Sequence, residues 1–530
     1  MLNESSPRRL PLVSAFLDPP GPSRALRRPW DRHLAPLAVG WFVLVATALW
    51  RRPLWPVDET RYLSVAWEMW LRGDFLVPYL NGAPYSHKPP LLFWLMQAGW
   101  TLFGMNEWWP RAVAPLFALA SLFLTALLGR RIWPQRAQCG ETAAWILFGS
   151  LLFALFATLT MFDVLLTGFA LLGVHGVLRA SRGQALRGFA QLAAALGLGA
   201  LAKGPVILLH LLPVALLAPW WMPQPRPPAV RWYLGVAAAT LVGAAIVLSW
   251  ALPAGNAGGS AYRNAILWGQ TAGRMAHSFA HPHPWWWYLP MLPAILFPWP
   301  LWPQLWRALN RLRTAPPDPG VRLLLAWIVP AFIGFSLISG KQPNYLLPLV
   351  PGVALLAAYA LHALVGVDLP PRLRALAAAS PALVLAINTA VIRQVGVDHD
   401  LHPIGDHLRM LQQSGVPIAH IGSYLGQFQF VGRLTRPIEV LEPEQVPRWV
   451  ESHPCGRLIG YSDAALSREA QASAAHSPST RGHPLGEPEF SQGYRRKRVF
   501  VWGPGPVCAD AARRARHPQP LLTRRAPPAY

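Results

Sequence analysis

Long unbroken runs of apolar residues limit what this chain can fold into more than any other feature. Runs of about 20 mostly apolar residues can cross a bilayer as helices. Eleven such runs occur, at 33–50, 108–129, 141–160, 164–178, 189–202, 205–221, 232–252, 286–306, 321–339, 344–363 and 373–393. Only 13% of the residues are charged, against about 25% in ordinary soluble proteins. The sequence therefore predicts an all-α polytopic membrane protein with about 11–13 transmembrane helices.

The distribution of basic residues predicts the orientation of the chain. The formal net charge is +23, but the cations lie between the apolar runs, so we expect no nucleic-acid partner. If 89–105 stays at the outer surface without crossing, the inner loops carry fourteen arginines. The outer loops after the first then carry only four cations, Lys203, Arg263, Arg274 and Lys341. Cytoplasmic loops are enriched in basic residues, so this arrangement is favoured and 89–105 is expected to be a juxtamembrane or re-entrant helix.

The same pattern divides the chain into three parts. Residues 1–32 are expected to form a basic cytosolic tail before an uncleaved signal anchor. Residues 33–393 form the membrane domain, with a long outer loop at 51–107. From 394 to 530, short apolar runs alternate with polar, proline-rich turns, which indicates a small α/β domain on the outer, periplasmic side. There, Cys455 and Cys508 can form one disulfide, although their spacing alone does not decide it.

Acidic residues at two outer positions are candidates for chemistry. Asp58 and Glu59 form an adjacent pair just beyond the first span, where a carboxylate can act as a general base. The alternative is a structural role at the start of a helix over 59–71. Asp163 is the only acid in the apolar stretch 142–178. Such groups usually line a cavity or have a charged partner, and the alternative is again a helix cap.

Lysine is used sparingly and selectively. The chain has 43 Arg and 4 Lys, and three of the lysines, Lys88, Lys203 and Lys341, fall in predicted outer loops. An ammonium group is a compact ligand for phosphate. No acid occurs between Asp163 and Asp318, so the later outer loops are purely cationic. We therefore expect an outer cavity with carboxylates on one wall and anion-binding groups on the other; the alternative is that these cations meet lipid headgroups.

Neither a metal site nor a cofactor site is predicted. Among His87, His277, His281 and His283, the pair His281-Pro282-His283 lacks a helical i,i+4 spacing and no Glu lies near it. The tryptophan run at 285–287 is typical of an aromatic belt. The sequence contains no phosphate-binding glycine loop, no Ser/His/Asp arrangement and no nucleotide-binding motif.

Residues 58–111, from DETRYLSVAWEMWLRGD through LNGAPYSHKPP to NEWWPR, closely resemble the first periplasmic loop of the bacterial aminoarabinose transferases. That family consists of membrane glycosyltransferases of the GT-C class and is distantly related to protein O-mannosyltransferases. Further matches are Asp163, the Lys203-Gly204-Pro205 turn, Arg274 and the segment from Lys341 to Pro348.

The resemblance implies that a sugar is transferred from a polyprenyl-phosphate carrier, such as undecaprenyl phosphate, with inversion. The acceptor would be lipid A or another envelope glycolipid at the periplasmic face of the bacterial inner membrane. The residues it implicates, together with the lysines noted above, are Asp58, Glu59 and Asp163 for catalysis; Lys88, Arg274, Tyr345, Lys203 and Lys341 for the carrier phosphate; and Tyr62, Tyr85 and His87 as the substrate loop. No metal is required.

One departure from the family affects the expected substrates. The family commonly has Glu-Lys-Pro where this chain has His87-Lys88-Pro89, which changes the local charge by about one unit. The sugar and the acceptor are therefore left open. An enzyme like the protein O-mannosyltransferases, with a polypeptide acceptor, is one alternative. A lipid transporter is another, but transporters more often show internal repeats and broken midplane helices.

Overall fold

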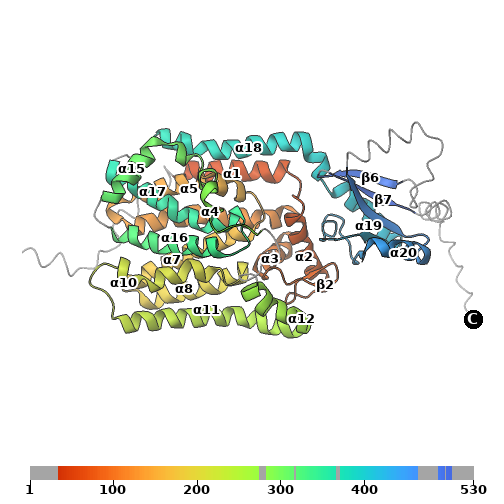
Figure 1. Cartoon of the computed structure of the whole chain (residues 1–530), viewed down its shortest axis with the longest axis horizontal. Helices are drawn as coiled ribbons and strands as arrows, with labels where there is room; N and C mark the ends of the chain where they lie inside the picture. The colour runs from red at the N-terminus through yellow and green to blue at the C-terminus, as the bar shows by residue number, and fades with distance from the viewer. Residues whose placement is uncertain are drawn as a thin grey trace, which may run out of the picture.

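The computed structural model describes residues 34–273, 282–314, 318–365, 371–463, 488–495 and 497–503. Long helices lie side by side in one part of the molecule, and a sheet-containing domain lies at one end of this bundle (Figure 1). The helices α2 and α3 of the outer loop lie at that same end, between the bundle and the sheet. The fold is thus mainly helical, with a C-terminal α/β domain.

Within the described residues, seven helical segments are long and apolar enough to cross a membrane. They are α4 (Trp108–Ile132), α7 (Phe162–Ser181), α8 (Ala185–Lys203), α11 (Ala229–Ala257), α16 (Pro319–Leu337), η7 (Pro343–Leu349) continuing into α17 (Val350–Val365), and α18 (Pro371–His399). The protein is therefore a multi-pass membrane protein.

The four other predicted crossings contain shorter helices. The first is α1 (Ala35–Arg51), of 17 residues. The others are divided: α5 (Gln138–Phe148) with α6 (Leu151–Phe156), α9 (Ile207–Leu216) with α10 (Ala218–Trp221), and η5 (Leu289–Met291), α14 (Leu292–Ile295) and η6 (Trp299–Leu301) before α15 (Pro303–Thr314). Four prolines lie between 290 and 300. Proline removes a helical hydrogen bond and clashes with the preceding turn, which explains the last interruption.

The helix α7 lies in the interior of the bundle and carries Asp163 in its first turn. Its backbone approaches that of α8 closely at two glycines. A Cβ atom added to Gly188 would lie 2.4 Å from the backbone nitrogen of Ala180 and 2.6 Å from the carbonyl oxygen of Gly176. Small residues at such crossings let membrane helices approach closely. This packing holds the end of α7 against the start of α8, and the ion pair of Asp163 with Lys203 joins the other ends of the two helices.

The outer loop folds into α2 (Asp58–Arg72), a two-stranded hairpin and α3 (Leu91–Phe103). The hairpin strands β1 (Tyr79–Leu80) and β2 (Ala83–Pro84) are joined by Asn81-Gly82, whose φ angles are 52° and 86°. Positive φ at both central residues defines the tight hairpin turn that Asn-Gly favours. The 13 residues of α3 span about 20 Å, too little to cross a hydrocarbon core of about 30 Å.

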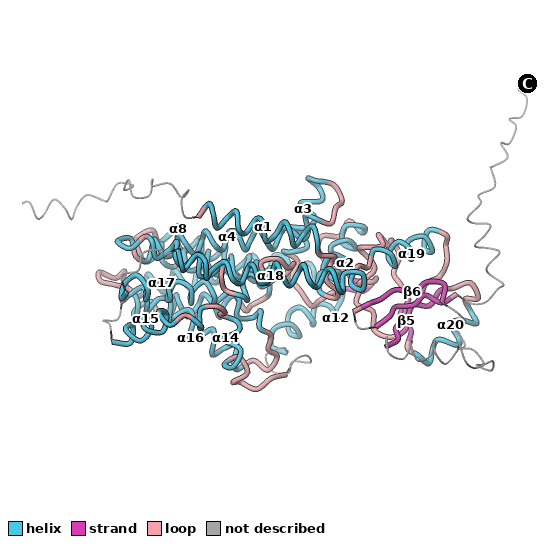
Figure 2. Tube along the Cα trace, turned by 90° about the horizontal axis from the view of Figure 1, so that it is seen from above, coloured by secondary structure: helices cyan, strands magenta, loops and turns pink. Residues whose placement is uncertain are grey.

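The C-terminal domain is a five-stranded sheet with three short helices. Its strand order is β4-β3-β5-β7-β6, with β3 parallel to β4 and β5, and β7 antiparallel to β5 and β6. The elements are α19 (His402–Gln413), β3 (Ile418–Ile421), β4 (Glu439–Leu441), η8 (Pro443–Gln445), α20 (Val446–Ser452), β5 (Arg457–Asp463), β6 (Pro488–Tyr494) and β7 (Lys497–Trp502). Figure 2 shows this sheet beside the bundle, joined to it by α18.

Some features of this domain differ from the pattern in the sequence. The apolar runs predict β3, β4, β5 and β7, but α19 and β6 carry no comparable signal. The helix α18 continues to His399, past the boundary predicted at 393. Cys455 is disulfide-bonded, whereas Cys139 is a free, buried thiol; Cys508 lies outside the described residues.

The C-terminal domain is hydrogen-bonded to the outer loop along the hairpin and α2. Asn81 Nδ2 donates to the carbonyl of Ile438 and Asn81 Oδ1 accepts from the Ile438 amide, both at 2.8 Å. Trp67 Nε1 donates to the carbonyl of Leu434 at 2.9 Å. The amide of Phe430 donates to Ser64 Oγ at 3.1 Å. The outer loop is therefore held between the helix bundle and the C-terminal domain.

Candidate active site

A cavity of about 390 Å³ opens beside the start of α2, and four stretches of chain that are distant in sequence line it. Its lining residues are Trp55, Asp58 and Glu59 from the outer loop, Phe156, Leu159 and Met161 from the segment before α7, His283 and Trp287, and Lys341, Gln342, Pro343 and Asn344. His283 stacks on Trp287 with ring centroids 4.3 Å apart. The cavity thus combines a carboxylate wall, an ammonium group and an aromatic surface.

Asp58 supplies the accessible carboxylate of this cavity. Its side chain is 52% exposed and forms an ion pair with Arg61, and Tyr62 Oη donates to it at 3.3 Å. Asp58 is the first residue of α2, but no side chain caps that helix. A carboxylate in the first turn is still stabilised by the helix dipole. The helix dipole therefore accounts for its charge, and the residue also lines the cavity.

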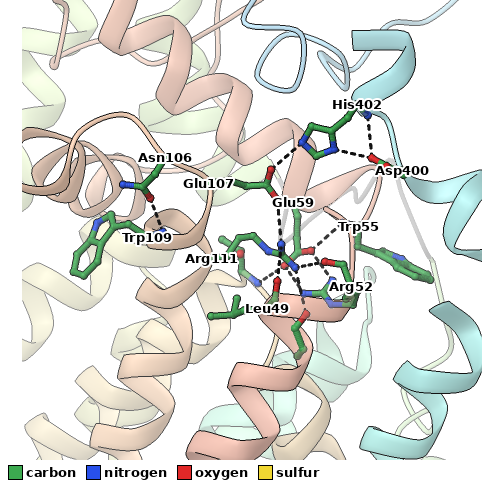
Figure 3. A network of polar contacts seen from close by, with 12 residues as sticks. Leu49, Arg52, Trp55, Glu59, Asn106, Glu107, Trp109, Arg111, Asp400 and His402 are labelled. Carbon is green, nitrogen blue, oxygen red and sulfur yellow. Dashed lines mark hydrogen bonds and ion pairs between the residues drawn. The ribbon is translucent and has the colours of Figure 1, made fainter. Parts of the chain in front are cut away.

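Glu59 is buried and its carboxylate is fully engaged (Figure 3). Arg52 donates to it through Nη1 at 2.6 Å and Nη2 at 3.0 Å. The backbone amides of Trp55 and Thr160 donate to it at 2.9 and 3.0 Å. Burial alone would raise the pKa of Glu59, but the charge and hydrogen bonds of Arg52, with the charge of Arg111, lower it to about 2. Such a group holds backbone segments together and accepts a proton poorly.

Asp163 lies directly behind the cavity wall and is 2% exposed. One carboxylate oxygen forms an ion pair with Lys203, and the other accepts from Asn344 Nδ2 at 2.9 Å. The residue that precedes α7 as its cap is Met161, so Asp163 is not the cap residue that the alternative reading required. Lys203 Nζ also lies 4.3 Å from the ring centroid of Tyr345. Asp163, Lys203, Asn344 and Tyr345 therefore form one polar group beside the cavity.

Two further predicted cations, Lys341 and Lys88, lie near this group. Lys341 is 2% exposed, and its ammonium donates to the carbonyls of His283 at 2.8 Å and Ile338 at 2.5 Å. An ammonium has three protons, so one remains for a ligand in the cavity. Lys88 Nζ lies 5.4 Å from the ring centroid of Phe162, the neighbour of Asp163.

Three predicted residues, Arg274, His277 and His281, lie outside the described residues. Within the residues described, no group of three or more His, Cys, Asp or Glu side chains is arranged to hold a metal ion.

The predicted substrate loop rests on an aromatic cluster around Phe162. The ring of Tyr62 lies edge-on to Phe162 at 4.8 Å, and Phe93 lies 5.7 Å from it. Tyr85 contacts Phe93 at 6.4 Å and His87 at 5.2 Å. Tyr62 and Tyr85 are buried, whereas His87 is exposed. The cluster therefore holds the loop that carries Lys88 against the start of α7.

Those predicted residues that the structure describes come together, but not on two separate walls of opposite charge. Lys203 pairs directly with Asp163, so acids and cations alternate around the cavity. Four further residues of the site are not predicted from the sequence: Arg52, Asn344, Gln342 and Trp287. A signal for Arg52 exists: Arg51 and Arg52 follow the first span on the predicted outer side, where basic residues are depleted.

Several known proteins are similar to this chain in sequence. The sequence profile of the dolichyl-phosphate-mannose-protein mannosyltransferase family matches residues 87–250. An undecaprenyl phosphate-alpha-4-amino-4-deoxy-L-arabinose arabinosyl transferase of Pseudomonas fluorescens is 32% identical over 338 residues, which are 62% of this chain and 60% of that protein. One from Pseudomonas aeruginosa strain PAO1 is 34% identical over 336 residues, which are 61% of this chain and 58% of that protein.

Solved structures resemble the whole fold. The apo crystal structure of ArnT from Cupriavidus metallidurans superposes with a TM-score of 0.68 at 18% identity, covering 89% of this chain and 98% of that one. The chain has the ArnT fold. The same protein bound to undecaprenyl phosphate gives a TM-score of 0.64 over the same shares of the two chains. The sequence matches span only about 60% of the length of the curated relatives.

Proposed function

We propose that the protein is an inverting glycosyltransferase that moves a sugar from an undecaprenyl-phosphate carrier to lipid A or another envelope glycolipid. The observation that carries this proposal is the cavity where the exposed Asp58 carboxylate and the Lys341 ammonium line one space beside the Asp163–Lys203 pair. The curated relatives, which carry arabinosyl transferase names, support the reaction class, and the ArnT complex supports the carrier.

The residues of the cavity suit each part of the reaction. The acceptor oxygen attacks the anomeric carbon, the bond from that carbon to the phosphate oxygen breaks, and the phosphate keeps the electron pair. Asp58 takes the acceptor proton or directs the acceptor to its position. Lys88, Lys203 and Lys341, with Arg274 from the sequence pattern, stabilise the charge on the phosphate. Glu59 and Arg52 hold the backbone of this site.

The site is placed at the periplasmic side of the bacterial inner membrane. This orientation rests on the fourteen arginines in the alternate loops that do not contribute to the cavity, because cytoplasmic loops collect basic residues. In this orientation the outer loop and the C-terminal domain share the periplasmic side.

A polypeptide acceptor is the second candidate, and the match of residues 87–250 to the protein mannosyltransferase profile favours it. The two candidates share the carrier and differ in the molecule that receives the sugar. Specificity of this kind depends on loops and pockets more than on the fold.

Reconstitution of the full-length protein tests the proposal. Purified protein in liposomes would be given undecaprenyl phosphate-4-amino-4-deoxy-L-arabinose with lipid A, or with an unfolded polypeptide, and the products weighed by mass spectrometry. Lipid A that gains the mass of the sugar supports the proposal, and glycosylated polypeptide supports the second candidate. The transferase assignment would be contradicted if no sugar left its undecaprenyl-phosphate carrier with any donor and acceptor tried.

Replacing Lys88 by Ala is expected to weaken binding of undecaprenyl phosphate by about 10-fold to 100-fold, because hydrogen bonds to charged groups contribute about 1.5–3 kcal/mol. Isothermal titration or native mass spectrometry of the protein with undecaprenyl phosphate measures this. Lys497→Ala is the control, since it removes the same charge from the exposed first residue of strand β7. Equal affinities of the two variants for undecaprenyl phosphate would contradict a role of Lys88 in binding the phosphate.

A further inference from the structure

A chain of polar contacts runs from the C-terminal domain to the residue next to Asp58 (Figure 3). His402 Nε2 lies 3.0 Å from one Glu107 oxygen, and the other Glu107 oxygen accepts from Arg111 Nη1 at 3.0 Å. Arg111 Nη2 donates to the backbone carbonyl of Arg52 at 2.6 Å. Arg52 in turn holds Glu59 through both terminal nitrogens. Five side chains from four elements thus form one connected network.

Positive and negative groups alternate along this network except at Arg111 and Arg52, two cations that meet at the backbone carbonyl of Arg52. Hydrogen bonds from His402 to Asp400, at 2.6 Å, and to Glu107 raise the pKa of His402 to about 10, so its imidazole carries a positive charge at neutral pH. Glu107 and Glu59 are negative, and Arg111 and Arg52 are positive. The network is well buried at Arg111, whose side chain is 5% exposed. Charge-assisted hydrogen bonds of this kind are stronger than neutral ones.

The linker, here the residues from Asp400 to Ile404 between α18 and the first turn of α19, contains His402 and is hydrogen-bonded to the C-terminal sheet. Gln492 of β6 accepts from the amide of Ile404 at 3.2 Å, and its own amide donates to the carbonyl of Asp400. On the other side, His399 stacks on Trp55, which lines the cavity, with ring centroids 4.6 Å apart. The linker therefore joins the sheet to the wall of the active-site cavity.

At its far end the network holds the second wall of the site. Thr160 donates its amide to Glu59 at 3.0 Å, and Arg52 Nη2 donates to the carbonyl of Thr158 at 3.0 Å. Thr158 and Thr160 belong to the segment that leads into α7 and Asp163. A single buried ion pair therefore fixes the backbone beside both carboxylates of the site.

We propose that His402 and Glu107 are positioning residues for sugar transfer, through which the C-terminal domain holds the Asp58 segment in its reactive place. This inference rests on the proposed function, because it assigns Asp58 a role in transfer. A reacting group that moves by about 1 Å can cost about 100-fold in rate. The carrier phosphate depends on lysines outside this network, so loosening the network reduces turnover and leaves carrier affinity nearly unchanged.

Replacing His402 by Ala in the full-length protein tests the inference. We expect kcat to fall about 10-fold to 100-fold. The affinity for undecaprenyl phosphate should stay within about twofold of that of the unmodified protein, because a positioning group affects the transition state more than ground-state binding. His407→Ala is the matched control. His407 lies in the same helix α19 and contacts Glu489 at 3.1 Å, but this pair stays within the C-terminal domain. We expect His407→Ala to retain its kcat.

Two more variants separate positioning from folding. His402→Lys keeps a positive charge and is expected to recover part of the lost kcat. Glu107→Gln is expected to lower kcat to the level of His402→Ala, and the double variant to fall no further, because both break the same contact. If His402→Ala does not fold, the kcat values of His402→Lys and Glu107→Gln relative to the unmodified protein still test the inference.

Equal kcat values for His402→Ala and His407→Ala, or a carrier affinity that falls as much as kcat, would overturn the inference. The proposed function fails separately, if the unmodified protein transfers no sugar from any sugar-charged undecaprenyl phosphate to any acceptor tried. If Asp58→Asn is inactive while His402→Ala matches its control, only the positioning inference is lost.

Discussion

Replacing Asp58 by Asn is expected to lower the rate of sugar transfer by about 10²-fold to 10⁴-fold, the range for loss of a general base. Asn has nearly the same shape as Asp but cannot accept the proton. Asp58 is 52% exposed and bonds to the side chains of Arg61 and Tyr62, so folding should change little. The affinity for undecaprenyl phosphate should remain, because the lysines proposed to bind the phosphate are unchanged.

The chain offers a close control for this variant. Asp406 is also 52% exposed and also pairs with an arginine three residues later, Arg409, at 2.6 Å. It lies in α19 of the C-terminal domain, away from the cavity. Asp406→Asn should transfer sugar at the normal rate. Transfer assays on both variants with a radiolabelled sugar decide the matter: normal activity of Asp58→Asn would refute its role.

Replacing Glu59 by Gln is expected to lower the free energy of unfolding by about 3–5 kcal/mol, because Arg52 is then a buried cation without its counterion. Thermal or chemical unfolding in detergent measures the change. Asp406→Asn is the control, since Asp406 and its partner Arg409 are 52% and 40% exposed and exposed pairs contribute about 1 kcal/mol or less. Equal losses for the two variants would contradict a structural role for the Arg52–Glu59 pair.

The same pair gives stability a defined pH dependence. The pKa of Glu59 falls from 4.5 to about 2 in the folded protein, so the folded state favours the charged form. Its contribution is complete above pH 4.5 and is lost as the pH falls towards 2, amounting to about 3 kcal/mol at 1.36 kcal/mol per pKa unit. Unfolding of Glu59→Gln should lack this part of the acid dependence. An unchanged acid profile in the variant would contradict the prediction.

The helical architecture is predictable from the sequence because apolar runs are long and arginines separate them. The division of 141–160, 205–221 and 286–306 into short helices is harder to predict. The mean hydropathy of an apolar run stays the same whether or not the helix breaks, as it does at Gly149 and Leu217. The helix α19 and strand β6 are missed because both are short and polar, and their stability comes from contacts such as the hydrogen bond from Ile404 to Gln492.

The membership of the candidate site is also largely predictable, but its internal pairing is not. Asp58, Asp163, Lys88, Lys203 and Lys341 follow from charge segregation and from the resemblance of the outer loop. The pairing of Asp163 with Lys203, 40 residues away, depends on how α7 and α8 cross. The network from His402 to Arg52 connects residues up to 295 positions apart, and no local pattern encodes such contacts.

The structure of the full-length protein with undecaprenyl phosphate bound tests the central claim most directly. We expect a cryo-EM map to place the phosphate within hydrogen-bonding distance of at least one of Lys88, Lys203 and Lys341, in the cavity lined by Asp58. A phosphate bound at the opposite end of the helices, or beyond the reach of all three lysines, would contradict the assignment of this cavity as the transfer site.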